Sequence, residues 1–163
     1  MMRKYIWASI LGAVLLGCNS CISVRFTMPA SAKHDPDLAA TAAILFAKEA
    51  FIDLNQPEAY DFLSDGMRRH ASLEQYINMI ARMHPDGFPD EVTAAEYEAA
   101  PGEDAMFIWL FRKGREESFY YRLRMEVTAE MRYKVAEVER VDKLPASQSR
   151  KPLPARRSTA GLR

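Results

Sequence analysis

The apolar residues between residues 34 and 85 repeat about every 3.6 residues, the period of an α-helix, and predict three helices. Asp37 suits the N-cap of the first helix, which runs to Leu54 and is apolar around most of its circumference. We expect such a helix to be buried on more than one side. Pro57 suits the first turn of a second helix, which Gly66 interrupts.

The third helix is predicted from its start and stop signals. Ser72 and Gln75 have the spacing of a capping box, in which two side chains satisfy N–H groups at a helix start. The apolar residues that follow fall on one helical face: Leu73, Tyr76, Ile77, Ile80 and Met83. His84-Pro85 ends the helix, because the residue before a proline disfavours helical backbone angles.

Beyond residue 90 the apolar period changes to 2, which indicates strands. Four are predicted, at residues 92–98, 105–111, 117–127 and 131–141. The second is apolar at nearly every position, so we expect it to be covered on both faces. Short turns, at residues 101–104, Lys113-Gly114 and residues 128–130, predict an antiparallel meander. The fold class is therefore α+β, with three N-terminal helices and a four-stranded antiparallel sheet.

The amino terminus has the pattern of a cleavable signal peptide. Arg3 and Lys4 precede an apolar run over residues 5–16, which is shorter than the roughly 20 residues of a membrane-spanning helix. The residues that end the run, Leu15-Leu16-Gly17-Cys18, resemble the lipobox of bacterial lipoproteins. This resemblance implies cleavage between Gly17 and Cys18 and a lipid on Cys18. The alternative is an ordinary secretory signal with a chance cysteine.

The lipobox also implies a location in the cell. Asn19 follows the cysteine, and in lipoproteins a residue other than Asp at this position implies the outer membrane, facing the periplasm, if the host has two membranes. Cys21 has CxxC spacing with Cys18, but a redox or metal pair needs two free thiols and lipidation would consume one. We expect a cell-envelope protein that is anchored to a membrane through its N-terminal lipid.

Charge and proline content divide the rest of the chain. The 22 basic and 22 acidic residues balance overall, but residues 143–163 contain six basic residues and no acid, with three prolines. We expect this segment to be a disordered basic tail, because it has too little apolar content to order. The expected organisation is a signal peptide (1–17), a flexible tether (18–36), one domain (37–141) and the tail (142–163).

Three phrases within residues 36–141 carry a resemblance: Asn55-Gln56-Pro57-Glu58-Ala59-Tyr60, Phe62-Leu63-Ser64 and Arg132-Tyr133-Lys134-Val135-Ala136. Together with the element order, they resemble the nuclear transport factor 2-like (cystatin-like) superfamily, especially its small bacterial lipoproteins of unknown function. The resemblance implies a curved sheet around the first helix, forming a cone with a pocket at its open end. Tyr133 departs from the Trp of many members. Members include isomerases, dehydratases and non-catalytic binding domains, so no activity follows.

Candidate pocket residues come from the expected register of the last two strands. A three-residue turn over residues 128–130 would place Tyr121 opposite Glu137 on the apolar face, where the two side chains could line a pocket. A one-residue slip would instead send Glu137 to solvent. An active site of the isomerase type needs two acidic residues in the pocket, and the sequence offers no second acidic residue there.

The histidines and the basic tail exclude other classes of site. The three histidines are dispersed along the chain, so we expect no metal and no cofactor. The only basic patch is the tail of an exported protein, which disfavours nucleic acid as a partner.

A candidate dimer face comes from the second predicted strand. A two-residue turn at Lys113-Gly114 pairs Met106 with Tyr121 and Ile108 with Phe119 toward the helix. The outward-pointing residues would then be Phe107, Trp109, Phe111 and Tyr120. These suggest a homodimer, since an aromatic centre with a charged rim is typical of interfaces. The alternatives are that the tail or tether covers this patch, or that another register turns it inward.

We therefore expect a membrane-tethered domain that binds a small apolar ligand or a protein partner without catalysis. The alternatives are a pocket enzyme of isomerase or dehydratase type, acting on a small hydrophobic substrate, and a purely structural envelope protein.

The lipobox leads to a direct test. Replacing Cys18 with Ala should abolish labelling by a radioactive or alkyne-tagged fatty acid and leave the precursor uncleaved, because the thioether has no sulfur on which to form. Gel mobility and lipid labelling of the wild type and the variant measure both effects. Labelling that persists and moves to Cys21 would contradict the assignment of Cys18.

Overall fold

The computed structural model describes residues 34–100, 105–112 and 118–162. Every described residue belongs to one compact unit, Ser31–Arg163. The signal peptide, Gly17, Cys18 and most of the expected tether lie outside the described residues. So do the turns that we predict at residues 101–104 and at Lys113-Gly114.

The helical part of the described chain begins two residues earlier than expected. Its elements are α1 (Pro36–Ala47), a π-helical turn η1 (Lys48–Ile52), α2 (Gln56–Asp61), α3 (Asp65–His70) and α4 (Leu73–Arg82). Asp35, and not Asp37, caps α1, and its carboxylate accepts from the backbone N–H of Asp37 at 2.9 Å and of Leu38 at 3.1 Å. Pro36 has no N–H and suits the first helical position, which moves the cap to the residue before it.

The second predicted helix is two helices in the structure. Ser64 N–H donates to the Val135 carbonyl at 2.8 Å, so the chain leaves the helix here to meet the sheet. The Ser64 hydroxyl then caps α3 by accepting from Met67 N–H at 3.2 Å. The predicted capping box of Ser72 and Gln75 is confirmed at the start of α4.

The described strands form one antiparallel sheet of five strands, in the order β4-β3-β2-β1-β5. They are β1 (Thr93–Ala99), β2 (Ala105–Arg112), β3 (Phe119–Val127), β4 (Tyr133–Val141) and β5 (Lys151–Ser158), followed by the short 3₁₀ helix η2 (Thr159–Leu162). The α+β class and the antiparallel sheet are confirmed. The helix count and the strand count are corrected, because four α-helices and five strands replace three and four.

The fifth strand comes from the segment that we expected to be a disordered tail, so that expectation is wrong. β5 pairs with β1, and Leu153 is only 6% exposed and packs into the core. Thr159 and Val92 exchange two hydrogen bonds, at 3.1 Å and 3.2 Å. Backbone pairing at a sheet edge and one buried leucine therefore order a segment whose composition is mostly polar, and the domain extends beyond residue 141.

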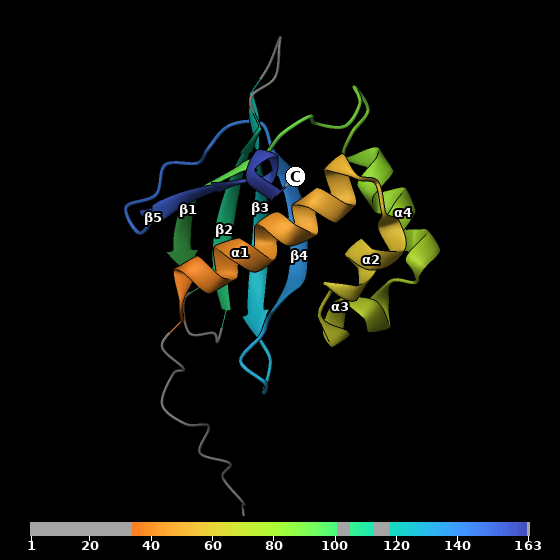
Figure 1. The fold of residues 1–163 in the computed structure, drawn as a ribbon, viewed down its shortest axis with the longest axis horizontal. Helices are drawn as coiled ribbons and strands as arrows, with labels where there is room; N and C mark the ends of the chain where they lie inside the picture. Colours follow the sequence, from red (N-terminus) through yellow and green to blue (C-terminus); the bar gives the residue numbers. More distant parts are fainter. Residues whose placement is uncertain (1–33, 101–104, 113–117, 163) are drawn as a thin grey trace, which may run out of the picture. The chain divides into compact units, whose positions relative to one another are not determined.

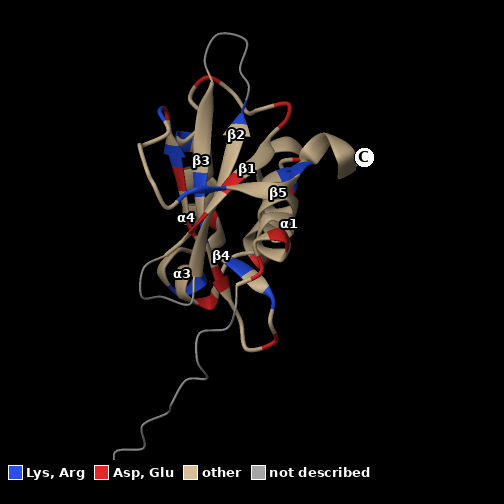
Figure 2. Cartoon of the chain, turned by 90° about the vertical axis from the view of Figure 1, so that its left-hand side faces the viewer, with Lys and Arg blue, Asp and Glu red and all other residues tan. Residues whose placement is uncertain are grey.

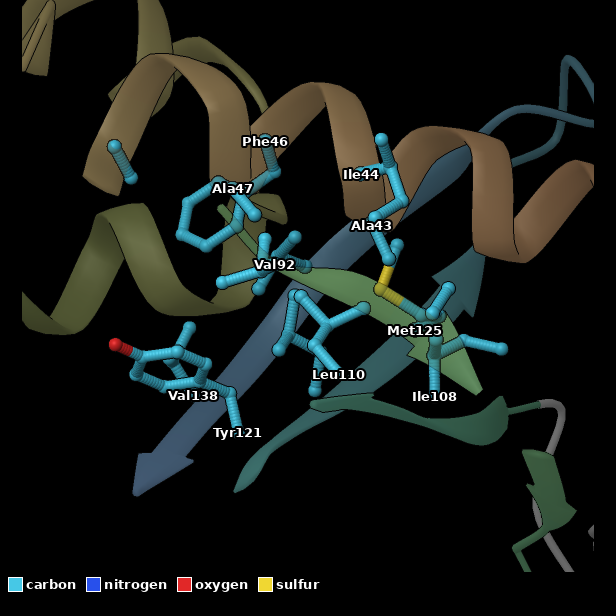
Figure 3. Close-up of a cluster of buried hydrophobic side chains, with 14 of the residues drawn as sticks. Ala43, Ile44, Phe46, Ala47, Val92, Ile108, Leu110, Tyr121, Met125 and Val138 are labelled. Carbon is cyan, nitrogen blue, oxygen red and sulfur yellow. The ribbon is translucent and has the colours of Figure 1, made fainter. Parts of the chain in front are cut away.

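Helix α1 lies across one face of the sheet, which we call the inner face, and α2 to α4 gather beside β4 (Figure 1). The core lies between α1 and this face, as Figure 3 shows: Ala43, Phe46 and Ala47 from α1 meet Ile108, Leu110, Tyr121 and Met125 from the strands. All of these side chains are buried. Alanines on the sheet-facing side of α1 let the helix approach the sheet closely.

The alternation along β2 and β3 is confirmed, but the predicted register is wrong. Ile108 lies opposite Leu123, and Met106 lies opposite Met125, four residues beyond the expected partner. The paired ends of the hairpin are Arg112 and Phe119, which leaves residues 113–118 between them and excludes a two-residue turn. Because the shift is an even number of residues, every side chain keeps its predicted face.

The fifth strand leads to a stability prediction. Leu153→Ala should lower the free energy of unfolding by about 2 kcal/mol, because it removes a buried side chain and leaves a cavity. Lys151→Ala on the same strand is the matched control and should change stability by less than about 0.5 kcal/mol, because Lys151 is exposed. Urea denaturation followed by circular dichroism measures both. Equal effects of the two substitutions would mean that β5 does not pack as described.

Candidate functional site

The structure does not bring the predicted pocket residues Tyr121 and Glu137 together. Val127 lies opposite Tyr133, so the turn is two residues longer than predicted and Val135 lies opposite Met125; a β-bulge between Arg124 and Met125 then places Glu137 opposite Arg124. Tyr121 is buried on the inner face, whereas Glu137 is exposed on the opposite face, which we call the outer face. The predicted pair is therefore wrong: the longer turn moves Glu137 away from Tyr121, and the bulge turns it to the other face.

Tyr121 instead forms a buried hydrogen bond with His84. The Tyr121 hydroxyl lies 2.7 Å from His84 Nε2, and His84 Nδ1 lies 2.7 Å from the Ile80 carbonyl oxygen. A carbonyl oxygen only accepts, so Nδ1 carries the hydrogen and the Tyr121 hydroxyl donates to Nε2. His84 is 5% exposed and Tyr121 is fully buried. Nothing in the sequence marks this pair, whose members are 37 positions apart and meet only through the fold.

Aromatic rings enclose the His84–Tyr121 pair. Phe51, in the π-helical turn, stacks on Tyr121 with 4.5 Å between ring centroids, and Phe88 stacks on His84 at 4.4 Å. Burial lowers the pKa of His84, with a smaller contribution from the charge of Arg140, and burial raises the pKa of Tyr121. The pair is thus held neutral, and its hydrogen bonds join α4 to the sheet.

The four residues of the predicted dimer face lie on strands β2 and β3 with their side chains on the outer face. Phe107, Phe111 and Tyr120 are half-buried, but Trp109 is only 2% exposed. The guanidinium carbon of Arg150 lies 5.2 Å from the centroid of the Trp109 ring. The centre of the expected exposed patch is therefore covered from within the same chain.

The cross-strand neighbours on this face also differ from those expected. Phe107 and Trp109 lie opposite Arg124 and Arg122, and only Phe111 lies opposite an aromatic residue, Tyr120. The altered hairpin register is the cause. The Phe111 and Tyr120 rings are 5.3 Å apart at 45°, so the partly exposed aromatic surface is a pair near the hairpin end of the two strands.

The segment that covers Trp109 is the connection from β4 to β5, residues 142–150, which we call the strap. β4 and β5 lie at opposite edges of the sheet, and the strap joins them (Figure 1). Arg150 Nη1 lies 3.5 Å from Glu96 Oε2, and the side chain of Arg150 is 9% exposed. The Ser147 hydroxyl donates to Glu98 Oε1 at 2.9 Å, and the Ser149 hydroxyl donates to the same oxygen. Two carboxylates of β1 thus hold the strap.

These carboxylates reach the outer face because β1 contains a bulge. Ala94 lies opposite Leu110 and Glu96 lies opposite Trp109, so Ala95 is the extra residue. With regular alternation, Ala94 and Glu96 would share the inner face. The bulge leaves Ala94 in the core and turns Glu96 to the outer face beside Trp109.

A cavity of about 590 Å³ lies on the outer face around this bulge. Its apolar wall consists of Trp109, Phe111 and Tyr120. Carboxylates on its lining come from Asp90, Glu91 and Glu96, and a guanidinium comes from Arg156 of β5. Figure 2 shows basic and acidic residues close together where β1 and β5 meet. The cavity has the two properties of a small-molecule site: aromatic surface and a few polar groups that converge on it.

Two buried polar atoms of the cavity-lining residues have unused hydrogen-bonding capacity. Among the residues that the structure describes, Trp109 Nε1 and Glu96 Oε2 have no hydrogen-bond partner, although Glu96 Oε2 is ion-paired with Arg150. The Glu91 carboxylate, by contrast, accepts from the Ser158 hydroxyl. Sequence reasoning identified Trp109, Phe111 and Tyr120 as an outward aromatic group but missed the carboxylates and Arg156, because the β1 bulge and β5 bring them there.

Two further findings concern the described residues alone. They contain no group of three or more His, Cys, Asp or Glu side chains placed to hold a metal ion. None of their helices has the length and apolar content needed to cross a membrane. Comparisons with models of protein families, with curated proteins and with solved structures gave no match.

The buried histidine predicts a pH dependence of stability. The pKa of His84 is lowered in the folded state, so the unfolded chain binds a proton more readily as the pH falls below about 6.5. The stability that neutral His84 contributes is therefore complete above this pH and is lost as the pH falls toward the folded-state pKa. Urea midpoints between pH 7.5 and 5 should decrease, and the decrease should be smaller in His84→Gln.

The control for this experiment is His70→Gln, since His70 is exposed at the end of α3. This variant should keep the full pH dependence of the wild type. If His84→Gln and the wild type lose the same stability between pH 7.5 and 5, His84 is not the titrating group.

Proposed function

We propose that this chain is a membrane-tethered binding protein of the cell envelope, and that its ligand occupies the outer-face cavity. The tether and the address rest on the signal pattern and on the lipobox residues Gly17 and Cys18. The observation that supports ligand binding is the cavity itself, in which half-buried aromatic rings stand beside carboxylates.

The proposed ligand site differs in place from the one that the superfamily resemblance implies. A nuclear transport factor 2-like cone would bind its ligand between the helix and the sheet, and we keep this fold as a proposal based on residues 36–141. In this chain, that space is packed with buried side chains of α1, β2 and β3. The outer-face cavity therefore takes precedence as the binding site.

The cavity also modifies the expected ligand. Phe111 and Tyr120 provide apolar contact, but carboxylates lie on the same lining, so the ligand should combine an apolar part with a polar group.

The two alternatives have less support. A homodimer through the same face is a weaker proposal, because Arg150 of the strap already covers Trp109. A pocket enzyme is also a weaker proposal, because the side chains of His84 and Tyr121, which it would use, are buried and hydrogen-bonded to each other.

Mass spectrometry of small molecules retained by the protein tests the proposal. The full chain is purified from its host in mild detergent and denatured, and the released molecules are identified. Tyr120→Ala should reduce the retained ligand at least about tenfold, because it removes part of the aromatic wall.

Phe107→Ala provides the matched control. Phe107 is another half-buried aromatic residue of the outer face, but it packs under Arg122 and does not line the cavity. This variant should retain the ligand as the wild type does. A ligand that both variants retain fully would contradict binding in the outer-face cavity.

A further inference from the structure

The strap shows which chemical group the outer face of the sheet accepts. Arg150 places its guanidinium over the ring of Trp109, at 5.2 Å from the centroid, and beside the carboxylate of Glu96, at 3.5 Å. A cation is favoured at such a place by the negative face of the aromatic ring and by the opposite charge. The side chain of Arg150 is 9% exposed, so this is a built and largely dehydrated cation site.

The outer-face cavity repeats this combination of an aromatic ring and a carboxylate farther from the strap. Trp109 and Glu96 belong both to the Arg150 site and to the lining of the cavity. Beyond them, the paired rings of Phe111 and Tyr120 form the next aromatic surface along the strands, and the carboxylates of Asp90 and Glu91 stand on the cavity lining. An aromatic surface with a neighbouring carboxylate is therefore present twice, and Arg150 occupies one of the two.

We propose that the outer-face cavity binds an organic cation, with a guanidinium or ammonium group on an apolar stem, through Phe111, Tyr120 and the carboxylates of Asp90 and Glu91. This inference rests on the proposed binding function and specifies the ligand class. The stem lies against the rings, and the cationic group lies between the rings and the carboxylates. The buried Trp109 Nε1 stays a donor for a neutral acceptor on the same ligand.

Arg156 makes the charge of the ligand testable, because its own charge changes the binding affinity in opposite directions for cations and anions. It is an exposed residue of β5 on the cavity lining, and its charge repels a cationic ligand but attracts an anionic one. Removal of this charge should strengthen the binding of a cation and weaken the binding of an anion. Arg156 is therefore a specificity residue, and a neutral ligand should hardly respond to its removal.

The test uses two probes of nearly the same shape. N-acetyl-argininamide carries the cation, and N-acetyl-citrullinamide replaces the guanidinium with a neutral urea group. Both are titrated into the full chain in detergent, with isotope-labelled backbone amides of β1 and β2 observed by NMR. We expect the arginine probe to shift amides around Ala95 and Phe111 and to bind about fivefold more tightly than the citrulline probe. Arg156→Ala should increase the affinity for the arginine probe about twofold.

Lys151→Ala is the control for Arg156→Ala, because it removes the same charge from the same strand at a position outside the cavity lining. It should leave the affinity of the arginine probe unchanged. Glu91→Gln should decrease the affinity for the arginine probe about twofold, since it removes a carboxylate charge from the lining.

The outcomes separate this inference from the proposed function. Equal affinity for the two probes, or weaker binding of the arginine probe in Arg156→Ala, would overturn the cation inference and leave a binding cavity. Absence of any shift around Ala95 and Phe111 at about 50 mM of the arginine probe would also overturn it. The proposed function is then decided separately by whether Tyr120→Ala loses the ligand that co-purifies with the protein.

Discussion

The connection between the two edge strands is the constraint on which the outer face depends. β4 and β5 lie at opposite edges, so the strap has to join one edge of the sheet to the other. A charged side chain that is taken out of water needs a partner of opposite charge, and Arg150 finds it in Glu96, over the ring of Trp109. The ion pair, the aromatic ring and the strap therefore pack together as one unit.

The bulge at Ala95 makes this unit possible and creates the neighbouring cavity. It reverses the faces of β1, so that Glu96 meets Trp109 while Ala94 stays in the core. The pairing of β1 with β5 shifts at the same place, from Ala94 opposite Arg157 to Glu96 opposite Pro152. Residues 153–156 of β5 thus lie beside the bulge, and they contribute both the buried Leu153 and the cavity-lining Arg156.

Local patterns predicted the parts of the structure that depend on local chemistry. Alternation placed Ile108 and Leu123 on one face, and the capping box started α4 at the right residue. Alternation determines which face a side chain occupies but not which residue lies opposite, because partners depend on turn lengths and bulges. This is why the sequence predicts Tyr121 opposite Glu137, although a longer turn and a bulge in β4 separate them.

The remaining errors have a related cause. β5 was missed because a strand at a sheet edge tolerates proline and needs few apolar side chains, so its composition looks like that of a tail. The His84–Tyr121 hydrogen bond and most of the cavity lining join distant parts of the chain, and no short pattern encodes such meetings. Sequence reasoning identified the aromatic wall of the cavity, whereas its charged groups required the fold.

The position of β5 has a consequence for when the chain can fold. The hydrogen bonds between Val92 and Thr159 join residues 67 positions apart, and the cover of Trp109 comes from residue 150. A nascent chain that still lacks residues 150–159 can therefore neither complete this sheet nor cover Trp109. The sheet forms completely only after this late segment has left the ribosome, so the order of synthesis sets the order in which the two faces of the sheet close.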